Sequence, residues 1–229
     1  MNGRFSIVKN VSSNGYLLEL LLYISVMFLI RETYIPNTHY LVNGFLYSGT
    51  TLLTASVLMK RRGISWKSIG LRRLENIPKT ILIAAAAVII IIAMLLIFDL
   101  IQDSFAFVKE SSAAAKATST GQTLSHGDYG YVLSVILFVW LQSALEELLE
   151  RGFLIHWLEG LFSNFKFKTA LAITIQACIW GFRHSYDISE RSISVALIGI
   201  IMGIVYVKCN RNLWTIIIAH CVMNTISLI

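Results

Sequence analysis

Three carboxylates and one guanidinium lie together in the apolar stretch 131–158, as Glu146, Glu147, Glu150 and Arg151. On a helix, Glu147 and Arg151 are four residues apart and can pair on one face, whereas Glu146 is rotated by about 100° and shares its face with Glu150. A pair of Glu147 with Arg151 leaves Glu146 without a local cation. If the cluster is catalytic, Glu147 and Arg151 orient the site or hold the end of a substrate. The alternative is the interfacial end of a helix.

Two further apolar stretches carry imidazoles. His220 and Asn224 are four residues apart, and His184 follows Trp180 at the end of its stretch. Each of these residues alone is more typical of helix packing or of a membrane interface. Their weight comes from their combination with the carboxylates.

An acid, two imidazoles and an amide can together activate a water molecule and stabilise an oxyanion. We predict that Glu146 is the general base and that His184 shares the attacking water. We predict that His220 and the amide of Asn224 donate hydrogen bonds to the developing oxyanion.

A zinc ion is the competing account, because two histidines and a glutamate can form a catalytic zinc site with one open position. The helical His-Glu-x-x-His pair of zinc proteases is absent, and Asn224 is a poor zinc ligand. We therefore favour catalysis without a required cofactor, with zinc as the alternative. Cys178, Cys209 and Cys221 have no metal-site or disulfide spacing.

The elements that must position these residues are long apolar stretches. The chain has 229 residues, of which 56% are hydrophobic and only 14% charged, whereas a soluble domain carries about a quarter. A helix of roughly 20 apolar residues crosses a bilayer. We predict an all-α, polytopic transmembrane helical bundle with about seven spans in one membrane domain. The predicted spans are 15–31, 40–59, 80–101, 131–158, 169–186, 192–208 and 213–229.

The lysines and arginines predict an orientation. With the N-terminus in the cytoplasm, 14 of them fall on the cytoplasmic side and 5 on the other, which agrees with the positive-inside rule. This count places Arg151 inside and Arg183 outside. The net charge of +6 thus reflects membrane topology, and we expect no nucleic-acid partner.

Two connections differ from the rest. The basic connection 60–79 interleaves its cations with Trp66, Ile69 and Leu71, so it is either an amphipathic segment at the membrane surface or a solvated loop on the cytoplasmic side. The connection 102–130 is rich in Ala, Ser, Thr and Gly, and we expect it to be exposed and mobile.

Residues 131–229 resemble the CPBP intramembrane proteases, which include type II CAAX prenyl proteases, bacteriocin-processing and immunity proteins, and abortive infection proteins. The family carries three motifs in order. Glu-Glu-x-x-x-Arg is met by Glu146, Glu147 and Arg151, Phe-x-x-x-His by His184 with Trp180 for the phenylalanine, and His-x-x-x-Asn by His220 and Asn224. The resemblance implies similar catalytic roles for these residues, with residues 1–130 as additional N-terminal transmembrane helices. Arg183, beside the motif histidine, bears on substrate preference.

The resemblance implies an intramembrane endopeptidase that cuts a membrane-associated peptide or protein. The alternatives are a metal-dependent version of this protease and a non-enzymatic bacteriocin immunity protein in the membrane. A transporter with Glu146 and Glu147 as proton carriers lacks the expected repeats and broken helices. We expect an integral protein of a bacterial cell membrane, which makes a prenylated substrate unexpected.

One tension concerns depth in the membrane. His184 falls near the outer end of its predicted span, whereas Glu146 and His220 lie deeper. These side chains can meet only if the spans are tilted or staggered, or if the predicted boundaries are displaced by a turn.

Overall fold

The computed structural model of the chain describes residues 13–33, 35, 40–102 and 129–228, and these residues form helices and no strand. The all-α prediction is therefore confirmed. The helices are α1 (Ser13–Glu32), α2 (Tyr40–Arg61), α3 (Ile77–Gln102), α5 (Tyr129–Glu147), the π-helix η1 (Leu148–Leu154), α6 (Ile155–Leu161), α7 (Lys168–Ser185), α8 (Glu190–Lys208) and α9 (Leu213–Leu228).

Each predicted apolar stretch lies on a helix of the structure. The largest difference concerns the fourth stretch, where one helical path continues through α5, η1 and α6 to Leu161. Within the described ranges, two helices, α3 and α8, are long and apolar enough to cross a membrane, and shorter apolar segments lie in α1 and α9. These helices support a membrane protein.

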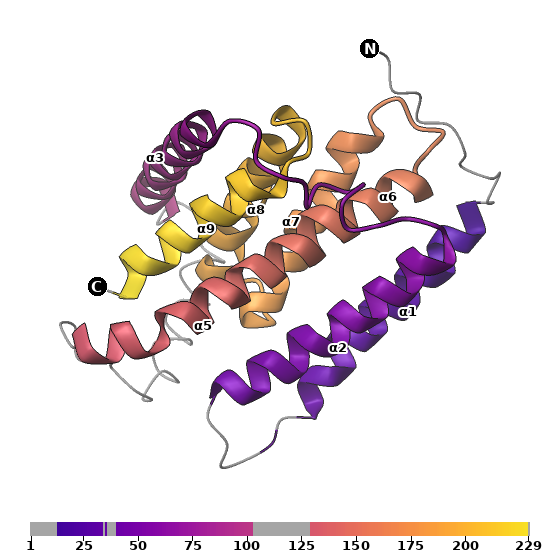
Figure 1. Cartoon of the computed structure of the whole chain (residues 1–229), viewed down its shortest axis with the longest axis horizontal. Helices are drawn as coiled ribbons and strands as arrows, with labels where there is room; N and C mark the ends of the chain where they lie inside the picture. The colour runs from indigo at the N-terminus through magenta and orange to yellow at the C-terminus, as the bar shows by residue number, and fades with distance from the viewer. Residues whose placement is uncertain (1–12, 34, 36–39, 103–128, 229) are drawn as a thin grey trace.

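The helical path from α5 to α6 runs through the middle of the bundle (Figure 1). The hairpin of α1 and α2 lies on one side of it, where α1 contacts α6 and α2 contacts α5. On the other side, α9 packs against both α5 and α3, and α7 packs along α8. The central path can therefore carry side chains that meet residues from most other helices.

The outward faces of the helices are apolar. On α3, Ile91 is fully buried, whereas Leu82 and Leu100 are 71% and 81% exposed. A helix that is apolar on all faces would be unstable on a soluble surface but is suited to lipid. The buried core is aromatic where α1 meets the central path, with Trp157 stacked on Phe153 at 4.2 Å between ring centroids and Tyr23 beside Phe153.

Small residues bring α7 and α8 into close contact. A side chain on Gly181 would overlap the backbone oxygen of Ser192 and lie 2.8 Å from Cβ of Ala196. Close approach through small residues is typical of helix pairs in membranes, where dispersion forces replace the hydrophobic effect. This packing fixes the position of α7, which carries His184.

The basic connection between α2 and α3 docks against the protein. Ile69 is 2% exposed, and its carbonyl oxygen accepts a hydrogen bond of 2.5 Å from Tyr206. Gly70 has a φ of +125°, and a side chain there would overlap the carbonyl oxygen of Arg211. The segment 62–76 forms no helix, and Ile69 packs against the protein, so its side chain is not available to lipid. The place of the segment at the membrane surface stays a prediction. The cations Lys67 and Arg73 are exposed, as in the loop interpretation.

The expected mobility of the connection 102–130 is a prediction that lies almost entirely outside the described residues. The N-terminal residues 1–12 also lie outside them.

Candidate active site

The carboxylate cluster lies where the central path changes from an α-helix to a π-helix. The N–H of Ile155 donates to the carbonyl oxygen of Glu150, five residues earlier, which is the hydrogen bond that defines a π-helix. Single-turn π-helical segments within α-helices are frequent at functional sites. Here Glu147, Glu150 and Arg151 are all fully buried, so this segment carries its charged side chains inside the bundle.

Glu147 holds two basic side chains on one oxygen. Its Oε1 lies 3.0 Å from Nη1 of Arg151 and 2.7 Å from Nδ1 of His220. The predicted pair of Glu147 and Arg151 is thus confirmed. Arg151 is fully buried within the site, so it does not lie in a solvated connection.

Glu146 and His184 meet at a polar cavity of about 260 Å³. Its lining residues are Tyr47, Gln142, Glu146, Arg183, His184 and Tyr186. Glu146 accepts hydrogen bonds from Trp180 Nε1 at 3.3 Å and from Gln142 Nε2 at 3.4 Å. A carboxylate and an imidazole from two helices therefore face the same space.

The orientation of His184 leaves one nitrogen for chemistry. Its Nδ1 lies 2.8 Å from the carbonyl oxygen of Trp180. A carbonyl oxygen can only accept a hydrogen bond, so Nδ1 carries the proton and Nε2 of the neutral ring has a free lone pair. Tyr186, two residues after the histidine, ends α7 in the left-handed conformation with a φ of 59°.

The predicted conflict in depth between Glu146 and His184 is resolved by the true helix ends. Glu146 stands 15 residues before Leu161, at the end of α6, and His184 stands 16 residues after Lys168, at the start of α7. At about 1.5 Å per residue, both lie roughly 22–24 Å from the turn that joins the two helices. In an antiparallel pair these positions are level.

Trp180 lies between the parts of the site. Its ring contacts the rings of His184 and His220 edge-on, at centroid distances of 4.9 and 5.9 Å. Its face also lies 4.0 Å from the guanidinium carbon of Arg151, which is a cation–π contact. The indole of Trp180 therefore lies beside His184 and also covers Arg151.

The spacing of the sequence did not predict the buried pair of Glu150 and Arg183. Arg183 Nη1 donates to Glu150 Oε1 at 2.6 Å, and Gln176 donates to the other oxygen at 3.2 Å. Arg183 therefore belongs to the site and not to an outer connection. Both residues are charged and lie in apolar stretches, which is a signal that each needs a partner. Their pairing could not be predicted, because sequence spacing gives no contact between two different helices.

Asn224 lies one helical turn beyond His220 on α9. Its Nδ2 donates to Oγ of Ser143 at 2.8 Å, and Ser143 donates to the carbonyl oxygen of Val139 at 2.8 Å. This contact joins α9 to α5 beside the triad of Glu147, Arg151 and His220. The role of Asn224 as an oxyanion donor stays a prediction.

The zinc alternative concerns the side chains of Glu146, His184 and His220. Among the described residues, no three His, Cys, Asp or Glu side chains are arranged to hold a metal ion. In both histidines the engaged nitrogen is Nδ1, which contacts the backbone in His184 and Glu147 in His220. The three cysteines are free thiols.

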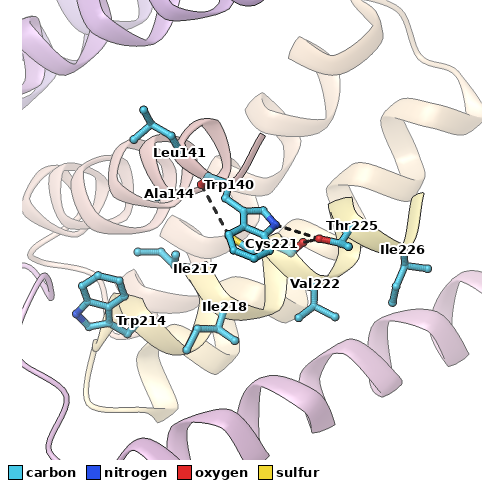
Figure 2. Close-up of a pocket in the computed structure, with 10 residues that line it drawn as sticks. All are labelled: Trp140, Leu141, Ala144, Trp214, Ile217, Ile218, Cys221, Val222, Thr225 and Ile226. Atoms are coloured by element: carbon cyan, nitrogen blue, oxygen red, sulfur yellow. Dashed lines mark hydrogen bonds between the residues drawn. The ribbon is translucent and has the colours of Figure 1, made fainter. Parts of the chain in front are cut away.

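A larger apolar groove of about 620 Å³ lies on the outer face of α5 and α9 (Figure 2). Trp140 and Thr225 bridge it with a hydrogen bond of 3.0 Å, and Trp214 lies at one end. Cys221 is the one titratable side chain among its lining residues. The groove therefore lacks the acid and base that hydrolysis needs.

We compared the chain with known proteins, and the one match that we report covers the segment that contains this site. Neither the curated proteins nor the solved structures gave a match. A family model described as type II CAAX prenyl endopeptidase Rce1-like matches residues 128–226, a segment that contains all six predicted site residues. The predicted resemblance to the type II CAAX prenyl endopeptidases is therefore confirmed for residues 128–226.

Proposed function

We propose that this protein is an intramembrane endopeptidase that hydrolyses a peptide bond of a membrane-associated peptide or protein. The observation that carries the proposal is the meeting of Glu146 and His184 at one polar cavity, on helices that are distant in sequence. The match of residues 128–226 to an endopeptidase family supports the same activity.

In the proposed reaction, a water molecule lies between the carboxylate of Glu146 and Nε2 of His184. Glu146 accepts a proton while the water oxygen attacks the peptide carbonyl carbon, whose π electrons move to the oxygen. As the oxyanion collapses, the C–N bond breaks and Glu146 returns the proton to the leaving amine. The products are a carboxylic acid and an amine.

His220 supports the oxyanion in this mechanism. Glu147 accepts from its Nδ1, so Nε2 is the nitrogen left to face the carbonyl oxygen, and it donates when the ring is protonated. Asn224 has a second N–H besides the one that Ser143 accepts, and we propose it as the second donor. Loss of one such donor lowers kcat by about 10²–10³.

We further propose a bundle of about seven spans in a bacterial cell membrane, with the N-terminus in the cytoplasm. The helices at all seven predicted stretches and the bias of positive residues support this arrangement. The polar cavity would then lie below the membrane surface, at the end of α7 away from the cytoplasm.

The test uses the purified full chain in lipid vesicles. The substrates are quenched fluorescent peptides with an apolar anchor, half of them prenylated on a cysteine. We expect Glu146→Gln to lower cleavage at least about 100-fold, because it removes the general base. The matched control is Glu159→Gln, which removes a carboxylate bonded to Arg211 and Thr169 instead.

Equal cleavage by the wild type and by Glu146→Gln would end the proposal, provided that both proteins have the same helical content. Cleavage that a chelator abolishes and zinc restores would favour the metal-dependent version. We expect the protein to cleave the unprenylated peptides in preference to the prenylated ones.

A further inference from the structure

A second cleft lies at the opposite end of α7 from His184. It has a volume of about 340 Å³ and lies between the start of α7 and the end of α8. Its lining includes two exposed lysines, Lys166 and Lys208, which we call its rim. It also includes the apolar side chains of Ile173, Ile204 and Val207, which we call its floor. Phe167 is 71% exposed beside Lys166, with its ring centroid 5.5 Å from the ammonium nitrogen.

The charge of this cleft is positive and uncompensated. Both lysines are exposed, and neither forms an ion pair within the described part of the chain. The nearby carboxylate of Glu159 is already engaged, because Arg211 donates to it at 2.7 Å and Thr169 at 2.5 Å. An anion at the rim would therefore meet two ammonium groups and no competing acid.

The apolar floor of the cleft suits a ligand that has an apolar chain attached to its anionic group. Ile204 is 46% exposed, and it precedes Lys208 by one helical turn, or about 6 Å. This length is short for a docked helix, whose contact face extends over several turns. It suits the region where a charged headgroup joins its acyl chains.

We infer that this cleft binds one anionic glycerophospholipid, with its phosphate at Lys166 and Lys208 and an acyl chain along Ile173 and Ile204. The inference rests on the membrane location of the protein and not on its proteolytic activity. Basic clefts between membrane helices at the cytoplasmic surface suit such headgroups. The groove on α5 and α9 differs, because its lining residues include no cation and so cannot select a headgroup.

The test measures the lipid retained by the full-length protein after extraction from vesicles of equal phosphatidylglycerol and phosphatidylcholine. Native mass spectrometry counts the lipids bound to each protein. We expect the wild type to retain one phosphatidylglycerol, and the double variant Lys166→Gln/Lys208→Gln to bind it more than tenfold more weakly, at about fivefold for each lysine. The matched control is Lys60→Gln/Lys67→Gln, which removes two exposed lysines elsewhere and should change binding less than twofold.

A second variant keeps the charge and fills the floor. Ile204→Trp should displace the lipid while both lysines remain, and unchanged retention would overturn the proposed site. Equal loss in the control variant would show diffuse attraction instead of a site, and so would equal retention of phosphatidylcholine. Displacement by soluble glycerol phosphate at low millimolar concentration would overturn the role of the acyl chain. Retention by Glu146→Gln should equal that of the wild type, which separates this test from that of the protease.

Discussion

Trp180 contacts four of the side chains that the motifs single out. Its N–H donates to Glu146, its carbonyl oxygen accepts from His184, its face covers Arg151 and its edge meets His220. The motif has phenylalanine at this position, so the indole adds one hydrogen bond to contacts that any aromatic ring could make. A single side chain thus joins the cavity to the buried triad.

We predict that Trp180→Phe lowers kcat/KM about fivefold and leaves the fold intact. The ring contacts remain, and the loss of one hydrogen bond is worth about 1 kcal/mol. Trp180→Ala should instead lower the free energy of unfolding by about 3–5 kcal/mol, because it leaves a cavity beside a buried cation. Peptide cleavage and thermal unfolding in detergent measure the two effects. A larger loss of activity in Trp180→Phe than in Trp180→Ala would contradict the argument.

The buried pair of Glu147 and Arg151 predicts a strong asymmetry between single and double variants. Either Glu147→Gln or Arg151→Met breaks this buried ion pair, with Glu147 keeping only its contact with His220 in the second variant, and such a loss costs about 3–5 kcal/mol in the free energy of unfolding. The double variant should cost clearly less than the sum of the two. Denaturant titration of all four proteins gives the coupling energy, and additive effects would show that the pair is not formed.

The pair of Glu159 and Arg211 is the partly exposed control, with Arg211 34% and Glu159 11% exposed. Its coupling should be below about 1 kcal/mol. Burial raises the pKa of Glu159, but the hydrogen bonds from Arg211 and Thr169 outweigh it and lower the pKa overall. The ionised Glu159 therefore stabilises the folded protein at pH values above the ordinary pKa of a glutamate. This stabilisation is lost as the pH falls through the lowered pKa.

At the scale of elements, the ion pair of Glu150 and Arg183 ties the π-helix to α7, one residue before His184. We predict that Arg183 is a positioning residue, so Arg183→Met lowers kcat while KM changes less than twofold. Arg183→Lys should recover part of the activity, since it keeps the charge without the planar donor group. Steady-state kinetics separates the two parameters. An effect on KM alone would indicate substrate binding instead.

The contact of α7 with α8 predicts opposite outcomes for two glycines. Gly181→Ala should lower the free energy of unfolding by more than about 2 kcal/mol and reduce activity, because the new methyl group overlaps the backbone of α8. Gly49→Ala on α2 is the matched control, because nothing lies within 4 Å of the new atom. It should be neutral or stabilise the helix by up to about 1 kcal/mol. Equal stability of the two variants would contradict the close packing of α7 on α8.

At the scale of the whole molecule, the proposed topology predicts which connections share a side of the membrane. In a variant without the three native cysteines, Lys67→Cys and Asn164→Cys should react with an impermeant maleimide from the cytoplasmic side. Asp187→Cys, in the connection between α7 and α8, should react from the opposite side. All three positions are exposed. Labelling of Lys67→Cys and Asp187→Cys from the same side would contradict the proposed topology, in which the chain crosses the membrane an odd number of times between these two positions.

The apolar stretches by themselves determined where the helices lie. Each of the seven predicted stretches coincides with a helix to within a few residues, because a run of apolar residues favours a helix whatever its neighbours do. The pairing of Glu147 with Arg151 was also predictable, since both residues belong to one helix and four residues make one turn.

Only the tertiary structure decided which helices share the site. The π-helical turn at η1, the pairing of Glu150 with Arg183 and the docking of Ile69 against Tyr206 all depend on residues distant in sequence. The same holds for Glu146 and His184, which are level because α6 and α7 form an antiparallel pair. Helical periodicity fixes the direction of a side chain around its own axis, but the relative height and rotation of two helices are set by the packing between them.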